Sequence, residues 1–223
     1  MSIFIIVIGV VFVGWFLYSW LPVRSIEKPV YSVMSEADGY EIREYAPYII
    51  AETIISGAKS RDDAAQKGFP IVAGYIFGDN TTKDKIAMTA PVNTEVDDSE
   101  KIAMTVPVNT EKIAMTAPVN TEAEDTEGTY KISFVMPSKY TLNTLPTPND
   151  SRVELREVPA RKVAVKRFSW SNSESTFKKQ EAEFLAALAR DDVETVGVVN
   201  IARYNVPWTI PFMLRNEVQI EIK

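Results

Sequence analysis

The chain has 223 residues, of which 46% are hydrophobic and 24% are charged, enough for one domain with a complete hydrophobic core. Its formal net charge of −6 and the absence of a basic run argue against a protein that binds nucleic acid. The sequence contains no histidine and no cysteine, which excludes imidazole and thiolate groups as metal ligands, general bases or nucleophiles.

The N-terminal segment, residues 3–21, carries no charged side chain. A helix of this length rises about 28 Å, close to the hydrocarbon thickness of a bilayer. Because the segment lacks the charged start and the small-residue cleavage site of a signal peptide, residues 1–23 are predicted to form an uncleaved transmembrane anchor. Arg24 and Lys28 follow it and no basic residue precedes it, which favours a single-pass protein whose domain, 24–223, is cytoplasmic. Two basic residues are a weak indication of orientation, so the alternative that the domain is extracytoplasmic remains.

The first half of the domain reads as strand, strand and helix. Residues 40–45 and 48–55 are rich in β-branched and aromatic side chains, which favours two strands. A helix is predicted to begin after Ser60, because a serine followed by acidic residues is typical of an N-cap. Pro70 is expected to kink this helix, and the glycine-containing turn at 78–80 is expected to end it.

An eleven-residue sequence then occurs three times. Lys-Ile-Ala-Met-Thr-Ala-Pro-Val-Asn-Thr-Glu stands at 85–95, returns at 101–111 with valine for one alanine, and returns unaltered at 112–122. Its alternation predicts a short strand that ends at the proline, and Asn-Thr-Glu predicts a turn. We expect one copy, 85–92 by preference, to join the main sheet. The other two should form a projecting hairpin-like arm or mobile loop within an insertion at about 96–128.

The same order of elements returns after a proline-rich connection. Residues 154–159 echo 41–47, and a second β-run, a second helix and two strands follow. The sequence therefore predicts an α+β domain built by internal duplication, with halves at about 30–145 and 151–223.

In the second half, the sequence pattern predicts which side chains of the helix and of the last strand face the core and which face solvent. Its helix should begin after Ser173, and its apolar face should carry Phe177, Phe184, Leu185 and Leu188. The last strand alternates, which places Val218, Ile220 and Ile222 inward and Glu217, Gln219 and Glu221 outward. Four further charged residues in strands are expected on the surface: Glu41, Arg43, Glu44 and Arg156.

Four motifs together resemble the SOUL heme-binding protein family. They are the repeated Lys-Ile-Ala-Met-Thr-Ala-Pro-Val, Ile-Arg-Glu-Tyr at 42–45, Gly-Tyr-Ile-Phe-Gly at 74–78, and Tyr-Asn-Val-Pro-Trp-Thr-Ile-Pro-Phe at 204–212 with Leu-Arg-Asn-Glu-Val after it. They stand in the family's order from about Glu27 to the C-terminus. The resemblance implies a distorted eight-stranded antiparallel β-barrel with two helices, made of two βαββ halves.

The resemblance also implies an activity, the non-covalent binding of heme or another tetrapyrrole in a shallow apolar groove beside the first helix. Without histidine, the chain would hold heme by apolar contact, by pairing Arg or Lys with the propionates, or through a Met or Tyr ligand. The ligand-binding residues this implies are Arg61, Gln66, Lys67, Phe69, Ala73, Trp208 and Phe212. Met88 is a candidate iron ligand, although methionine on a strand face is more often core.

No pair of acids is placed as a general acid and base, and a serine or threonine nucleophile would have only lysine to activate it. We therefore expect no enzyme, but a membrane-tethered carrier, buffer or sensor of tetrapyrroles. Two alternatives stay open. One is a binding module for another amphipathic planar molecule, because the duplicated plan also resembles gyrase-inhibitor-like effector-binding domains. The other is a membrane-associated scaffold that acts through its repeats.

Overall fold

The computed structural model describes residues 27–83, 85–86, 89–96, 128–205 and 209–223. The predicted membrane anchor, Met88, Trp208 and the second and third repeats lie outside these residues. Neither of the two α-helices within them is long and apolar enough to cross a membrane.

The described chain is an α+β domain, as predicted, with nine strands, two α-helices and one short 3-10 helix. In chain order these are β1 (Tyr31–Ala37), β2 (Tyr40–Tyr45), β3 (Tyr48–Ile55), α2 (Arg61–Ile76), β4 (Val92–Val96), β5 (Tyr130–Val135), β6 (Glu154–Val158), β7 (Arg161–Phe168), α3 (Glu174–Arg190), β8 (Thr195–Arg203), η1 (Pro211–Met213) and β9 (Asn216–Ile222).

All strands of the described chain form one antiparallel sheet in the order β1-β2-β7-β9-β8-β4-β5-β3-β6. The pairing of β4 with β8 joins two equivalent halves. On one side the order continues β8-β9-β7-β2, and on the other β4-β5-β3-β6. The two halves exchange one strand each. Strand β2 comes before β3 in the chain but pairs with β7 of the second half, and β6 comes before β7 but pairs with β3 of the first half. The topology thus agrees with the duplication predicted from the sequence.

The predicted eight-stranded barrel is wrong in two respects. The described sheet has nine strands, because β1 was missed, and it does not close. Its two edges are unsuited to pairing: β1 is exposed at every residue after Tyr31, and β6 has only five residues and carries charged side chains. Short or charged edge strands resist further pairing, so the sheet stays open.

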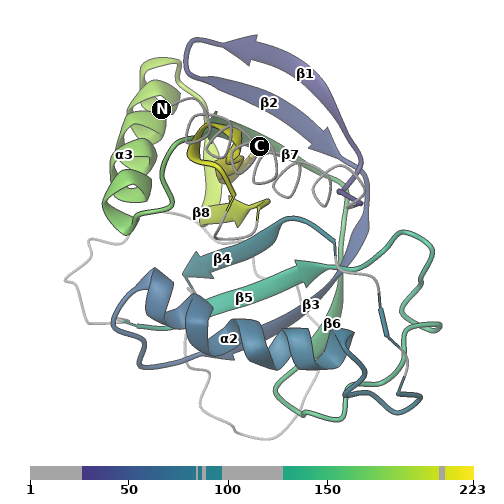
Figure 1. Ribbon diagram of the computed structural model, residues 1–223. Coiled ribbons are helices and arrows are strands. Elements are labelled where there is room, and N and C mark those ends of the chain that lie inside the picture. Colours follow the sequence, from purple (N-terminus) through teal and green to yellow (C-terminus); the bar gives the residue numbers. More distant parts are fainter. Residues whose placement is uncertain (1–26, 84, 87–88, 97–127, 206–208) are drawn as a thin grey trace, which may run out of the picture.

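The two helices cover the same face of the sheet. In Figure 1, α2 crosses β3 and β5, and α3 lies beside the half that contains β7 and β8. Thr94 of β4 faces Ile132, which packs near α2, on one side and Ile201, which packs near α3, on the other. Cross-strand neighbours point to the same face of a sheet, so each helix covers its own half of one continuous surface.

The helix-free face is concave. Arg161 of β7 donates a hydrogen bond of 3.0 Å to the hydroxyl of Tyr48 in β3. These strands are five places apart in the sheet, which would separate them by roughly 24 Å if the sheet were flat. The sheet must therefore bend back on itself, with its helix-free face inside the bend.

The helix ends follow the sequence closely. Ser60 and Ser173 cap the two helices as predicted, each accepting a backbone hydrogen bond from the residue three positions later. Helix α2 continues through Pro70 to Ile76. The predicted inward face of α3 is right for Phe177, Phe184 and Leu188, whereas Leu185 is 39% exposed.

The strand predicted at 85–92 is displaced. The strand of this copy, β4, is Val92–Val96, and it contains the Asn-Thr-Glu that was predicted to be a turn. This strand pairs with β5 on one side and β8 on the other, and Thr94 is only 1% exposed between them. Pairing on both sides outweighs the weak turn preference of the three residues.

Candidate functional site

Three of the residues predicted to line the ligand groove, Gln66, Phe69 and Ala73, lie on one side of α2. Gln66 is exposed, Phe69 is 40% exposed and Ala73 is buried at 5% exposure. The ring of Phe69 lies 5.2 Å from that of Phe134, which is fully buried in the core. Phe69 therefore stands at the border between the sheet-facing side of α2 and solvent, with part of its ring available to a ligand.

A second exposed aromatic residue extends this side of the helix. Phe77, the C-cap residue of α2, is 58% exposed. It lies eight positions after Phe69, which at 100° per residue turns it by about 80°, so the two rings lie on one side of the helix. Phe77 belongs to the Gly-Tyr-Ile-Phe-Gly motif, and its position just past the last apolar core residue could have marked it as a site residue.

The two cations predicted to hold propionates already have partners. Arg61 donates from Nη1 to Glu181 Oε2 of α3 at 3.1 Å, and its side chain is 11% exposed. Lys67 pairs with Asp63 one turn earlier, at 2.7 Å. Lys85 is a better-placed alternative, because it is exposed and forms no ion pair within the described chain. It directly precedes Ile86, whose N–H donates to the carbonyl of Ile76 at the end of α2.

Phe212 does not join α2. It belongs to η1, is 45% exposed, and its ring lies 6.1 Å from that of Trp170, in the connection between β7 and α3. The N–H of Trp170 also donates to the carbonyl of Pro211 at 2.8 Å. The structure therefore places Phe212 against the second half, while Gln66, Phe69 and Ala73 share the first helix.

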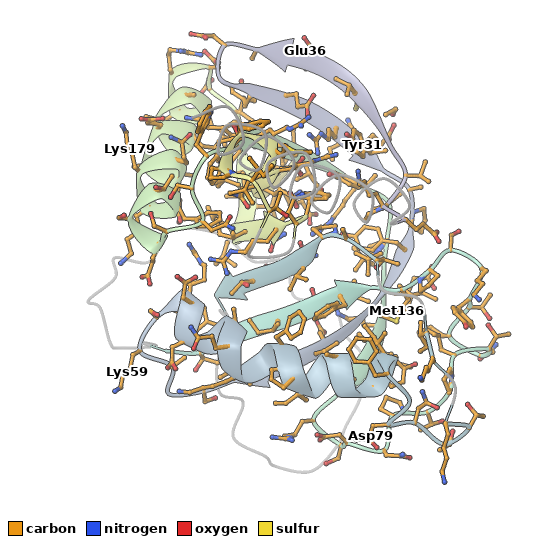
Figure 2. The ribbon with its side chains drawn as sticks, viewed as in Figure 1. Tyr31, Glu36, Lys59, Asp79, Met136 and Lys179 are labelled. Atoms are coloured by element: carbon orange, nitrogen blue, oxygen red, sulfur yellow. The ribbon has the colours of Figure 1, made fainter. Side chains whose placement is uncertain are left out.

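A cavity of about 280 Å³ lies where β2 leads into β3. Figure 2 labels Met136 at the end of β5, beside this junction. The apolar and aromatic residues that line it are Tyr48, Ile49, Val135, Met136, Tyr140 and Leu142. Small-molecule sites usually measure about 300–1,000 Å³, so this cavity is too small to enclose a tetrapyrrole. None of the predicted site residues that the structure describes lines it.

A buried ionic cluster lies on the helix-free face, where the sequence predicted surface charges. Glu217 is fully buried and accepts hydrogen bonds from Arg43 at 3.0 and 3.1 Å and from Arg215 at 2.7 and 2.9 Å. The hydroxyl of Tyr204 and the amide of Gln219 also donate to it, at 2.8 and 2.7 Å. The outward orientation predicted for Glu217 and Gln219, and the surface position predicted for Arg43, are therefore wrong.

Charge pairing governs the protonation of this cluster. Burial by itself raises the pKa of Glu217, but the charges and hydrogen bonds of Arg215 and Arg43 outweigh burial and hold the pKa below its ordinary value. Burial raises the pKa of the neighbouring Tyr45 to about 12. The carboxylate is thus fixed in its charged form and shielded from solvent, so the cluster holds strands together and offers no group for catalysis.

These features define a duplicated βαββ domain with an exposed aromatic side on its first helix. The chain belongs to the SOUL heme-binding protein family, whose model, described as "SOUL heme-binding protein", matches residues 26–109 and 93–221. Heme-binding protein 2 of Homo sapiens is 27% identical over 190 residues, which cover 82% of this chain and 80% of the human protein. Heme-binding protein 2 of Mus musculus is 35% identical over 78 residues, 33% of this chain and 38% of the mouse protein.

Solved structures share the fold at much lower identity. The C-terminal domain of EcmrR superimposes with a TM-score of 0.57 at 8% identity, covering 87% of this chain and 98% of that domain. A hydrolase from Listeria innocua gives a TM-score of 0.53 at 10% identity, covering 85% of this chain and 94% of that one. These similarities establish the architecture and carry no functional assignment.

Proposed function

We propose that this chain binds heme or a related tetrapyrrole non-covalently and has no enzyme activity. Its membership of the SOUL family, over residues 26–221, carries the proposal. Relatives named heme-binding protein 2 support it. The fully paired state of the buried ionic cluster also supports a binding rather than a catalytic role.

We place the tetrapyrrole on the outer side of α2. The partly exposed rings of Phe69 and Phe77 offer apolar surface to a planar macrocycle, which stacks favourably on aromatic side chains. Lys85, exposed and without an ion pair in the described chain, is the cation that we assign to a propionate in place of Arg61 and Lys67.

The residues fit a ring held by its faces better than a ring held by its iron. The sequence has no histidine or cysteine, and the described residues contain no cluster of acidic side chains that could hold a metal ion. When bound, heme would supply its own iron chemistry, while this chain would supply apolar contact and charge neutralisation.

This reasoning has a direct test. The full chain is titrated with hemin and, separately, with iron-free protoporphyrin IX, and binding is followed through the Soret band and tryptophan quenching. We expect both to bind at micromolar concentration with Kd values within about threefold, since apolar contact and propionate pairing are common to both. Hemin binding without protoporphyrin binding would show that an iron ligand dominates, and binding of neither would overturn the proposed function.

We further propose that residues 3–21 tether the domain to a membrane with the domain in the cytoplasm, because this segment is uncharged and basic residues follow it. The absence of cysteine makes a clean test possible, since a single Lys223→Cys substitution gives a unique thiol. A membrane-impermeant maleimide should label this thiol only after the cells are permeabilised. Labelling in intact cells would place the domain outside.

A further inference from the structure

A second cavity, of about 100 Å³, opens on the helix-free face, away from α2. Its floor is formed by cross-strand neighbours: Glu95 of β4 faces Asn200 of β8, which faces Gln219 of β9. Arg161 and Glu221 also line it. The cavity therefore lies at the junction of the two halves, on polar side chains from both.

A bulge in β8 makes room for this cavity. The register between β8 and β9 shifts between Val196 and Asn200, and Gly197 within the shift has a φ of +71°. Glycine adopts this left-handed conformation without strain, and a side chain there would meet no atom within 4 Å. β-Bulges recur beside binding sites because they separate two strands locally. The space between β8 and β9 is thus built into the backbone.

Two hydrogen-bond acceptors at this cavity have no donor. The carboxylate of Glu95 forms no hydrogen bond or ion pair with any described residue. Asn200 is 9% exposed, and its Nδ2 donates to Asn93 at 3.2 Å and to Gln219 at 3.1 Å, while its Oδ1 accepts nothing. A buried acceptor without a donor, such as Asn200 Oδ1, is rare and costly. The half-buried carboxylate of Glu95 beside it is also free to accept, so the pair favours a ligand that donates hydrogen bonds.

The charges at the cavity favour a cation. Arg161 pairs with Glu221 at 3.2 Å and Arg156 pairs with Glu52 at 2.9 Å, so both of these nearby cations have another carboxylate partner, whereas Glu95 forms no ion pair with a described residue. Burial raises the pKa of Glu95, although the positive charges of Arg161, Lys131 and Arg156 oppose the shift. A carboxylate in such a position gains from a partner of opposite charge. The buried Nε of Arg161 lacks an acceptor, which an oxygen atom on the same ligand would supply.

We infer that this cavity binds a small primary ammonium ion that carries a hydroxyl group, with the ammonium on Glu95 and Asn200 and the hydroxyl oxygen on Arg161. Three ammonium hydrogens match three acceptor oxygens, two on Glu95 and one on Asn200, and the single positive charge matches the carboxylate of Glu95. At roughly 30 Å³ per water molecule, the volume corresponds to about three waters, enough for about four non-hydrogen atoms. The site is separate from the tetrapyrrole surface on α2 and does not rest on it.

Three probes of equal size test the inference on the full chain. They are 2-hydroxyethylammonium, propylammonium, which lacks the hydroxyl, and ethane-1,2-diol, which lacks the charge. Ligand-observed saturation-transfer NMR measures each Kd, which for four heavy atoms we expect at about 0.1–10 mM. We expect 2-hydroxyethylammonium to bind about threefold to tenfold more tightly than propylammonium, and the diol to show no saturable binding. A diol that binds as tightly as the ammonium ions would overturn the inference.

Two variants locate the binding. Glu95→Gln keeps the shape of the side chain and removes its charge, so the Kd of 2-hydroxyethylammonium should rise at least about tenfold. Glu44→Gln, the matched control, removes an exposed charge on the other face of the sheet and should leave the Kd unchanged. Circular dichroism verifies that both variants are folded. An unchanged Kd in folded Glu95→Gln contradicts the inference, and if that variant does not fold, the three probes on the natural chain still decide it.

Discussion

The packing of α2 on the sheet depends on the absence of a side chain at Gly68. A methyl group there would lie 2.5 Å from Cγ1 and 2.9 Å from Cβ of Ile132, and 3.2 Å from Cγ1 of Ile55. Ile132 is fully buried in β5, and its Cβ is fixed to the strand, so relief requires α2 and β5 to separate. Gly74 in the same helix differs, because its nearest neighbour would be Cβ of Asp79 at 4.0 Å.

The same substitution should therefore change stability in opposite directions at the two positions. Replacing glycine by alanine inside a helix stabilises it by about 1 kcal/mol. At Gly74 nothing opposes this gain, and we expect Gly74→Ala to raise the free energy of unfolding by about 0.5–1 kcal/mol. At Gly68 overpacking costs about 1–3 kcal/mol, so the net effect of Gly68→Ala should lie between neutral and about 2 kcal/mol destabilising. The two variants should differ by about 0.5–3 kcal/mol.

Urea unfolding followed by circular dichroism measures both variants against the natural chain. Thermal unfolding should separate them by roughly 2–4 °C per kcal/mol, the value for a domain of this size. If Gly68→Ala is as stable as Gly74→Ala, the helix does not lie on Ile132 as described. Because Phe69 is the next residue, a displaced α2 should also weaken hemin binding in Gly68→Ala and not in Gly74→Ala.

Four further predictions follow from the burial and charge of particular side chains. Phe69→Ser should weaken hemin binding several-fold in a Soret titration, whereas Leu185→Ser, which removes an almost equally exposed residue from α3 (39% against 40%), should not. Arg43→Met should lower the free energy of unfolding by about 3–5 kcal/mol in urea, because it leaves the buried Glu217 short of a partner. The pKa of Glu217 is lowered, so its carboxylate stabilises the fold above pH 4.5, the ordinary glutamate pKa, and this contribution is lost as the pH falls through the lowered pKa. Glu217→Gln should therefore make the free energy of unfolding fall less steeply in acid. The pKa of Glu95 is raised, so its charged carboxylate destabilises the fold at neutral pH and this cost disappears in acid. Glu95→Gln should therefore raise the free energy of unfolding at neutral pH and lose this advantage in acid. An unchanged melting temperature at pH 7 would count against the burial of the Glu95 carboxylate.

Local signals in the sequence were sufficient where a local interaction decides the structure. The serine caps depend on a hydrogen bond within three residues, so both helix starts were predictable from Ser60 and Ser173. The duplication was visible because residues 154–159 echo 41–47, and the structure places these two stretches in equivalent strands. The resemblance to the SOUL family implied a site on the first helix, and helical spacing then selected Gln66, Phe69 and Ala73 on one side of it.

Features that depend on distant partners were not predictable from local patterns. Arg43 and Glu217 are 174 positions apart, and only their pairing allows both to be buried. Their hydrophilic character alone indicates a surface, as it did for Gln219. The strand at Val92–Val96 was missed for a similar reason, because Thr94 is held by neighbours from β5 and β8 that its own sequence does not reveal.

The cross-strand pairing of Val96 with Tyr130 has a consequence for the number of repeats. The connection at 97–129 leaves and re-enters the sheet at directly opposed positions, so its length does not alter the register of β4 and β5. Adding one more eleven-residue copy would lengthen it by about a third, which costs only about 0.3 kcal/mol of loop-closure entropy. A copy can thus be added to or removed from this connection without shifting the pairing of β4 with β5.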